Sequence, residues 1–307
     1  MIEVEHLSKH FGPKQAVQDL TFTVHPGRVT GFLGPNGAGK STTMRMIVGQ
    51  DHPTSGHVLV NGRRYVDEPT PLRELGALLD AQALHPGRPA FDHLRALAAT
   101  SGIGQGRVRE VLELVGLSDV ARTRTGTFSL GMTQRLGIAA ALLGDPKVIM
   151  LDEPVNGLDP DGIHWIRGLL RSLAAEGRTV FVSSHLMSEM ALTADHLIVL
   201  GRGRLLADVS MAEMIGSTGS SVRVRSPEPE ALVTQLVARG ADVKQLEPSV
   251  LTVRNLTQVE VAETAFAHRI LLHELTAQHS SLEDAYLALT HDDVEFAAPT
   301  NEMRKVA

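Results

Sequence analysis

A glycine-rich segment near the start of this 307-residue chain restricts its possible folds more than any other feature. The segment follows an apolar, β-prone run over residues 28–33 and precedes a predicted helix over residues 40–48. Glycines let successive backbone N–H groups turn toward one point, and the start of a helix adds a favourable dipole there. The segment consists of Gly34, Pro35, Asn36, Gly37, Ala38, Gly39, Lys40 and Ser41. Its spacing predicts a strand–loop–helix unit for the phosphates of a nucleoside triphosphate, which we expect to be ATP with Mg²⁺.

Two side chains of this segment carry the expected chemistry. Lys40 is expected to reach the β and γ phosphates, and the Ser41 hydroxyl is expected to ligate Mg²⁺. The alternative is a chance glycine-rich turn before an amphipathic helix. The complete spacing and the two flanking elements argue against that alternative.

A second motif is an apolar run over residues 148–151 that ends in Asp152 and Glu153. Ligands of α/β proteins bind at the carboxyl ends of the strands, where these two acids would lie. We expect Asp152 to orient the Mg²⁺ shell and Glu153 to polarise the attacking water as a general base. Taken alone, such a strand is common, and the acids could equally cap a helix.

A third candidate is His185, which follows the strand-like residues 181–184. A neutral imidazole at a strand end can hold the γ phosphate and the water in line. A lone histidine is more often structural or on the surface. Its position after a buried strand favours the functional interpretation once the other motifs are granted.

Composition excludes several classes of protein. A net charge of −6 argues against a nucleic-acid partner, and the absence of cysteine excludes disulfides and thiol chemistry and suits a reducing cytoplasm. The other histidines lack the spacing of metal ligands. Residues 1–6 lack the features of a signal peptide, and no apolar run reaches the roughly 18–20 residues of a spanning helix. We therefore expect no direct membrane span.

The order of elements predicts an α/β protein. Strand-like runs occur at residues 148–151, 179–182 and 197–200, and helical patterns lie between them. Unbroken apolar strands that alternate with helices predict a parallel sheet covered on both faces. A strand over residues 17–24 and a mainly helical region over residues 90–143 complete this part of the chain.

Local signals predict further details. Residues 57–60 form a short predicted strand that ends in Asn61-Gly62, a strong hairpin signal. Composition changes at a Gly/Ser-rich linker over residues 216–221. Beyond it we expect a small α+β appendage over residues 222–290, with helices at 228–239 and 259–268 and strand-like runs at 250–253 and 270–272, followed by a loose polar tail over residues 291–307.

The segment Phe128-Ser129-Leu130-Gly131-Met132-Thr133-Gln134-Arg135 resembles the signature of the nucleotide-binding subunits of ABC transporters. Ser129 and Gly131 match the usual Leu-Ser-Gly-Gly-Gln form, whereas Phe128, Leu130 and Met132 depart from it. The departures are typical of a subgroup for drug and antibiotic export, similar to bacitracin- and lantibiotic-resistance ATPases. Without the other motifs, this segment would be an ordinary capped helix start.

The resemblance implies roles for further residues. Residues 154–159 are similar to the family's D-loop, and Thr42 is expected to contact the nucleotide beside Ser41. Phe11 stands where the family stacks an aromatic ring on adenine, although an aromatic residue there could equally belong to the core. The family usually has a glutamine as a Mg²⁺ ligand at the position of Asp80. Gln82 lies nearby and could replace it, and a carboxylate can also ligate Mg²⁺.

The resemblance implies a P-loop NTPase of ABC type over residues 1–215: a RecA-like core, a helical subdomain at about 85–145 and an N-terminal antiparallel β part. It implies Mg²⁺-dependent ATP hydrolysis in a homodimer that encloses two ATP molecules, with Ser129 and Gly131 facing the partner's nucleotide. A separate permease would hold the chain at the cytoplasmic face of the membrane, and residues 91–122 would contact that permease.

The alternative is a soluble ABC-type ATPase in translation or repair. Such proteins carry two units in one chain or long insertions, and neither is found here. A P-loop kinase or a GTPase lacks support, because the guanine-reading Asn-Lys-x-Asp segment is missing.

Overall fold

A computed structural model describes residues 1–216, 221–278 and 282–290. Contacts divide the described chain into two compact units, one formed by residues 1–211 with Thr290 and the other by residues 212–289. Each unit is described by itself. The predicted linker falls largely on residues 217–220, and the predicted tail on residues 291–307, and both stretches lie outside the described residues.

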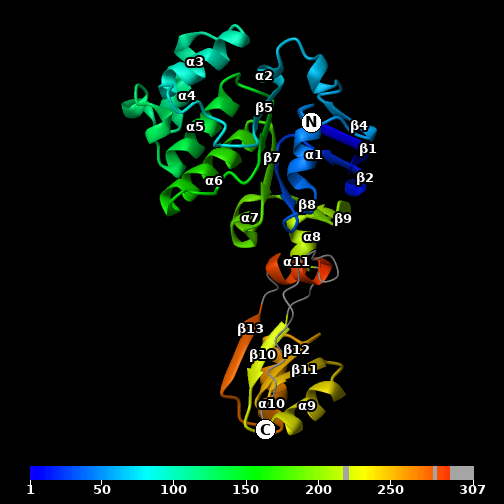
Figure 1. The fold of residues 1–307 in the computed structure, drawn as a ribbon. Helices are drawn as coiled ribbons and strands as arrows, with labels where there is room; N and C mark the ends of the chain where they lie inside the picture. Colours follow the sequence, from blue (N-terminus) through cyan, green and yellow to red (C-terminus); the bar gives the residue numbers. More distant parts are fainter. Residues whose placement is uncertain (217–220, 279–281, 291–307) are drawn as a thin grey trace, which may run out of the picture. The chain divides into compact units, whose positions relative to one another are not determined.

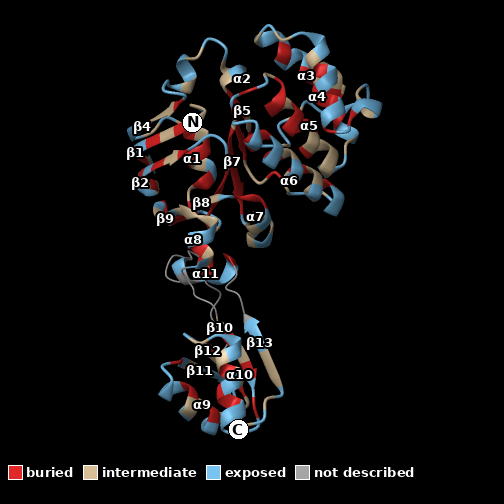
Figure 2. Ribbon diagram, turned by 180° about the vertical axis from the view of Figure 1, so that it is seen from behind, coloured by how far each residue is buried: buried red, intermediate tan, exposed pale blue. Residues whose placement is uncertain are grey.

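A six-stranded sheet forms the centre of the first unit (Figure 1). Its strands, in spatial order, are β5 (Leu75–Leu78), β6 (Val148–Leu151), β7 (Thr179–Ser184), β3 (Val29–Leu33), β8 (His196–Gly201) and β9 (Arg204–Ser210). The first five strands are parallel, and β9 pairs antiparallel with β8. Every residue of β3, β6 and β7 is buried, and buried strands appear red in Figure 2. The predicted parallel sheet is thus confirmed.

A second, antiparallel sheet consists of β2 (Lys14–Val24), β1 (Ile2–Phe11) and β4 (Ser55–Val60). A shared core joins it to the central sheet. Phe22 of β2 packs against Phe32 of β3 and Phe181 of β7, with ring centroids 5.8 and 6.1 Å away. The rings of Phe32 and Phe181 are 4.9 Å apart. Aromatic pairs at such distances add to the hydrophobic stabilisation.

Helices complete the first unit. Helix α1 (Lys40–Ile47) contributes Met44, Met46 and Ile47 to the core shared by the two sheets. The helical region contains α3 (Ala90–Thr100), α4 (Gln105–Leu114) and α5 (Leu130–Leu142), of which α5 packs on β5. The remaining helical elements are η1 (Tyr65–Asp67), α2 (Pro71–Glu74), η2 (Ser118–Val120), η3 (Thr125–Thr127), α6 (Pro160–Ala175) and α7 (Met187–Thr193). The N-terminal antiparallel part and the helical subdomain were both expected, and both are present.

The second unit contains a four-stranded antiparallel sheet in the order β11, β12, β10, β13. Apolar residues of the sheet, such as Val224 and Leu251, form one core with Leu232 and Leu236 of α9 and with Val261 of α10. The elements are α8 (Met211–Gly216), β10 (Ser221–Arg225), α9 (Pro229–Ala238), β11 (Asp242–Glu247), β12 (Val250–Arg254), α10 (Gln258–Ala267), β13 (Glu274–Gln278) and α11 (Leu282–Thr290). A small α+β appendage is therefore present.

Two local predictions differ from the structure, the first in part and the second entirely. Asn61-Gly62 forms a tight turn in which Val60 bridges Arg63, but β4 pairs with β1 and no second hairpin strand follows. The strand-like residues 270–272 lie in a loop, and the strand is β13 at Glu274–Gln278, which pairs with β10. In both places tertiary pairing, rather than local propensity, decides the outcome. Within the part of the chain that the structure describes, no helix combines the length and apolarity that crossing a bilayer requires.

Candidate active site

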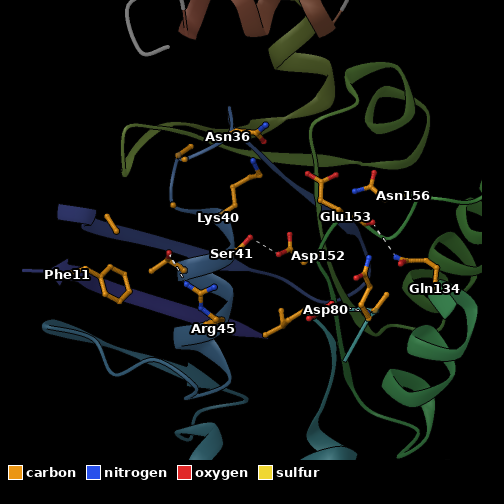
Figure 3. Close-up of a pocket in the computed structure, with 18 of the residues that line it drawn as sticks. Phe11, Asn36, Lys40, Ser41, Arg45, Asp80, Gln134, Asp152, Glu153 and Asn156 are labelled. Atoms are coloured by element: carbon orange, nitrogen blue, oxygen red, sulfur yellow. Dashed lines mark hydrogen bonds between the residues drawn. The ribbon is translucent and has the colours of Figure 1, made fainter. Parts of the chain in front are cut away.

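A cavity of about 750 Å³ lies beside the glycine-rich loop, at the carboxyl ends of the parallel strands. In Figure 3, Phe11 lies on one side of Lys40 and Ser41, and Glu153 lies on the other. The cavity wall includes these predicted site residues: Phe11, Asn36, Gly37, Ala38, Gly39, Lys40, Ser41, Thr42, Asp80, Gln82, Asp152 and Glu153. The other predicted residues, namely Gly34, Pro35, Ser129, Gly131 and His185, do not line this cavity.

The loop packs so closely on its surroundings that some positions accept only glycine. Gly39 has φ +102°, and a Cβ there would lie 2.7 Å from the carbonyl oxygen of Ala16. A Cβ on Gly34 would lie 2.7 Å from the carbonyl oxygen of Leu200. Backbone from β2 and β8 thus fixes the path of the loop. The Ala38 N–H donates to the Pro35 carbonyl oxygen at 3.1 Å, and the other N–H groups of the loop are suited to phosphate oxygens.

We expect Gly39→Ala to distort the loop as well as strain it. Gly27→Ala is the matched control, because Gly27 also has a positive φ but has open space around the position of a Cβ. A left-handed alanine costs about 1–2 kcal/mol at either site, and the clash with Ala16 adds to this only at Gly39. Urea unfolding should show the larger loss for Gly39→Ala, and only this variant should bind a fluorescent ATP analogue about tenfold more weakly. Equal behaviour of the two variants would contradict the role of the loop.

Lys40 is a buried cation, with 7% of its surface exposed. Its Nζ donates hydrogen bonds to the carbonyl oxygens of Gly34 at 2.6 Å and Pro35 at 3.3 Å. Burial lowers the pKa of the Lys40 ammonium, and the nearby Glu153 and Asp152 carboxylates act in the opposite direction. A bound phosphate anion would offset the free-energy cost of burying the Lys40 charge, so the site fits an anionic ligand.

Ser41 and Asp152 meet at the base of the cavity. The Ser41 hydroxyl donates a hydrogen bond of 2.7 Å to Oδ2 of Asp152, and the Ser183 hydroxyl donates to Oδ1 of the same carboxylate. Hydroxyl and carboxylate oxygens are the ligands that Mg²⁺ prefers. The donor set at this point therefore suits the predicted metal.

Glu153 is held at three points. Its φ is +50°, a left-handed conformation, and its N–H donates to the Ser183 hydroxyl at 2.9 Å. Its carbonyl oxygen accepts a hydrogen bond from Nε2 of Gln134 at 3.3 Å. Its carboxylate oxygen Oε2 lies 2.8 Å from Nδ1 of His185. The structure thus brings His185 to Glu153, although His185 does not line the cavity.

Asp80 and Gln82 both lie on the cavity wall, after β5. A hydrogen bond of 2.7 Å from the Asp152 N–H to the Leu78 carbonyl oxygen places the end of β5 beside the end of β6. The Asp80 carboxylate accepts a hydrogen bond of 2.8 Å from the backbone N–H of Gln82. Both candidates for the missing glutamine therefore belong to one short turn that faces the cavity.

Phe11 is 45% exposed, so the alternative of a core residue does not hold. It ends β1 at the cavity, and Nζ of Lys9 lies 4.9 Å from the centre of its ring. An exposed aromatic face at a ligand cavity is suited to stacking on a base.

The signature-like segment lies against the D-loop-like turn. Ser129 caps α5 by accepting a hydrogen bond of 3.2 Å from the Met132 N–H. A Cβ on Gly131 would lie 3.0 Å from the carbonyl oxygen of Gly157. Leu130 lines the cavity, but Ser129 and Gly131 do not.

Comparison with known proteins decides the family. The family model described as ABC transporter matches residues 17–156, and one described as a domain of unknown function (DUF8746) matches residues 220–283. The uncharacterized ABC transporter ATP-binding protein YhcH of Bacillus subtilis is 35% identical over 305 residues, covering 96% of this chain and 97% of that protein. The chain belongs to the ATP-binding proteins of ABC transporters. It is therefore a nucleotide-binding ATPase of this class.

Other relatives agree with this assignment. The bacitracin transport ATP-binding protein BcrA of Bacillus licheniformis is 41% identical over 212 residues, covering 68% of this chain and 69% of that protein. The lantibiotic transport ATP-binding protein SrtF of Streptococcus pyogenes is 34% identical over 208 residues, covering 68% of this chain and 90% of that protein. A solved dimeric structure of a bacterial ABC transporter cassette matches with a TM-score of 0.64 and 25% identity. The match covers 69% of this chain and 99% of the chain in that structure. The subgroup predicted from the signature is thus confirmed.

Two residues of the site were not predicted. Ser183 contacts both acids at the end of β6, and Gln134 reaches the backbone of Glu153 from α5. Ser183 lies two positions before His185, and Gln134 lies within the signature-like segment. Proximity to recognised motifs was the only signal in the sequence, and it gave no reason to assign either a role.

Proposed function

We propose that this chain powers the export of a peptide antibiotic of the bacitracin or lantibiotic kind through a separate permease. The observation that carries the proposal is the similarity to bacitracin and lantibiotic transport ATP-binding proteins. The composition of the cavity supports the ATPase part of the proposal. It contains Lys40, Ser41, Asp152 and Glu153, whereas Ser129 and Gly131 lie off its wall. A site that binds phosphates but lacks its signature residues is completed by a second copy, whose signature would face the nucleotide. The dimeric cassette among the similar structures supports this arrangement.

The residues fit Mg²⁺-dependent hydrolysis of ATP. Ser41 and Asp152 would hold Mg²⁺, with Asp80 or Gln82 as a further oxygen ligand, and the ion would neutralise negative charge on the phosphates. Lys40 binds the phosphates by charge-assisted hydrogen bonds. Glu153 accepts a proton from the attacking water, and His185 orients its carboxylate through the 2.8 Å contact.

Transport requires a membrane partner for this chain. We infer that a permease holds the chain at the cytoplasmic face of the membrane and contacts residues 91–122 of the helical region. The transport ATP-binding proteins among its relatives support this partner. The alternative, a soluble role in translation or repair, has no support among the named relatives, and a membrane partner would exclude it.

Expression in a susceptible bacterium tests the proposal. The chain should be produced together with its permease partner, and resistance to bacitracin and to a lantibiotic should be measured. We expect the inhibitory concentration of one of them to rise several-fold, and a Glu153→Gln variant to abolish the rise. The chain should also co-purify with the permease from membranes. Unchanged sensitivity together with an absence from the membrane fraction would favour the soluble role.

A further inference from the structure

Ser183 occupies an unusual position between the two acids of the site. It lies near the end of β7, is completely buried and does not line the nucleotide cavity. Its hydroxyl donates to Oδ1 of Asp152 and accepts the N–H of Glu153 at 2.9 Å. A hydroxyl has one proton to donate, a carboxylate only accepts, and a backbone N–H only donates. The direction of both hydrogen bonds is therefore fixed by chemistry.

The backbone of Glu153 depends on such support. A non-glycine residue in the left-handed region costs about 1–3 kcal/mol, and it persists only where the surroundings enforce it. Ser183 accepts the hydrogen bond of the Glu153 N–H, and the Glu153 carbonyl oxygen accepts hydrogen bonds from Gln134 Nε2 at 3.3 Å and from the Asn156 N–H at 3.2 Å. The backbone conformation in turn decides where the carboxylate of Glu153 points. In this structure it points to His185.

Other buried hydroxyls show that packing alone does not require these bonds. Thr179 lies on the same strand and Thr30 on the neighbouring β3, and the hydroxyl of each is buried without a hydrogen-bond partner. The sheet thus tolerates an unpaired hydroxyl at two positions. At Ser183, by contrast, the hydroxyl forms hydrogen bonds with both acids of the site, Asp152 and Glu153.

We propose that Ser183 is a positioning residue for hydrolysis, whose hydroxyl fixes the metal-facing carboxylate of Asp152 and the backbone of Glu153 in one arrangement. The inference rests on the proposed function, because it takes Glu153 as the general base and Asp152 as a metal-facing acid. Ser183 does not line the nucleotide cavity. It acts only through the two residues that it joins.

Removal of the hydroxyl tests the proposal. In Ser183→Ala, kcat for Mg-ATP hydrolysis should fall on the order of 10–100-fold, the usual loss when a partner of a metal-facing ligand is removed. The KM for ATP should stay within about twofold, because the phosphate contacts of Lys40 remain. Ser183→Thr keeps a hydroxyl at this position and should therefore keep most of the wild-type activity. Thr179→Val is the matched control, since it removes a buried, unpaired hydroxyl from the same strand, and it should keep wild-type turnover.

A second readout does not depend on activity. Hydrogen exchange of the peptide that contains Glu153 should be faster in Ser183→Ala than in the wild type, because the Glu153 N–H loses its partner. Thr179→Val should leave this peptide unchanged. Ser183→Cys serves if the alanine variant does not fold: the thiol is nearly isosteric but a weak donor, and it should show the same loss of kcat.

The outcomes separate this inference from the proposed function. If Ser183 acts through Glu153, Ser183→Ala should cost little further turnover in a Glu153→Gln background. Wild-type kcat in Ser183→Ala, or a threonine variant as slow as the alanine variant, would overturn the positioning role. An equal loss in both backgrounds would overturn the part of the proposal that acts through Glu153. Wild-type turnover in Glu153→Gln alone would instead contradict the proposed base, whatever Ser183 does.

Discussion

Glu153→Gln is expected to lower the rate of ATP hydrolysis by about 10²–10⁴-fold, the usual contribution of a general base. The amide keeps the shape of the side chain, and its oxygen can still accept a hydrogen bond from His185. It cannot take a proton from water at neutral pH. Phosphate release under saturating Mg-ATP measures the loss. Glu176→Gln is the matched control, because Glu176 pairs with Arg178 at an exposed position away from the cavity, and it should keep wild-type turnover.

The same variant should still bind ATP, since the loop, Lys40 and Ser41 are unchanged. It should accumulate as a dimer at saturating Mg-ATP, because the nucleotides that join the two copies are no longer consumed. Light scattering measures this state. Turnover close to wild type would remove Glu153 from its assigned role, and a monomer at saturating Mg-ATP would count against the composite site.

Lys40→Met should weaken ATP binding on the order of 10²-fold, because charge-assisted hydrogen bonds contribute about 1.5–3 kcal/mol each. Methionine keeps most of the buried stem but lacks the ammonium. Titration with a fluorescent ATP analogue measures the affinity. Lys147→Met is the control, because Lys147 is exposed and pairs with Glu74 away from the cavity, so it should bind ATP normally.

The Lys40→Met variant should also be no less stable than the wild type without nucleotide. Burial lowers the pKa of Lys40, which means that the charged form destabilises the folded state. At pH values below the folded-state pKa this cost is present in full. As the pH rises toward the ordinary lysine pKa of 10.5, the folded state releases its proton first, so wild-type stability rises relative to the variant. Urea unfolding at neutral and alkaline pH measures the difference, and a large loss of stability at neutral pH would contradict it.

Local sequence patterns predicted those elements whose signal lies within one continuous segment of the chain. The loop before Lys40, the buried strands β6, β7 and β8, and helices α3, α4 and α5 all have continuous signals. β1 and β5 carried no such signal. β1 has irregular pairing and a left-handed His6, and β5 is only four residues long.

Some features depend on residues far away in the sequence and could not be predicted from one segment. The apolar residues 270–272 suggested a strand, yet Leu271 is 58% exposed, and β13 forms later because it pairs with β10. Ser183 is 30 positions from Glu153, and Gln134 is 19 positions from it. The sequence pointed to the acids and to His185, but only the fold shows what holds Glu153 in place. The chemical roles of these residues stay predictions.

The aromatic contacts between the two sheets affect how the cavity binds a nucleotide. Phe11 belongs to the antiparallel sheet and Lys40 follows the central strand β3, and Phe22, Phe32 and Phe181 pack these two sheets on one core. The separation between Phe11 and Lys40 is therefore set by side-chain packing before any ligand arrives. Such preorganisation lowers the entropy that binding must remove. A smaller side chain at Phe22 would accordingly weaken nucleotide binding without altering a single residue of the cavity wall.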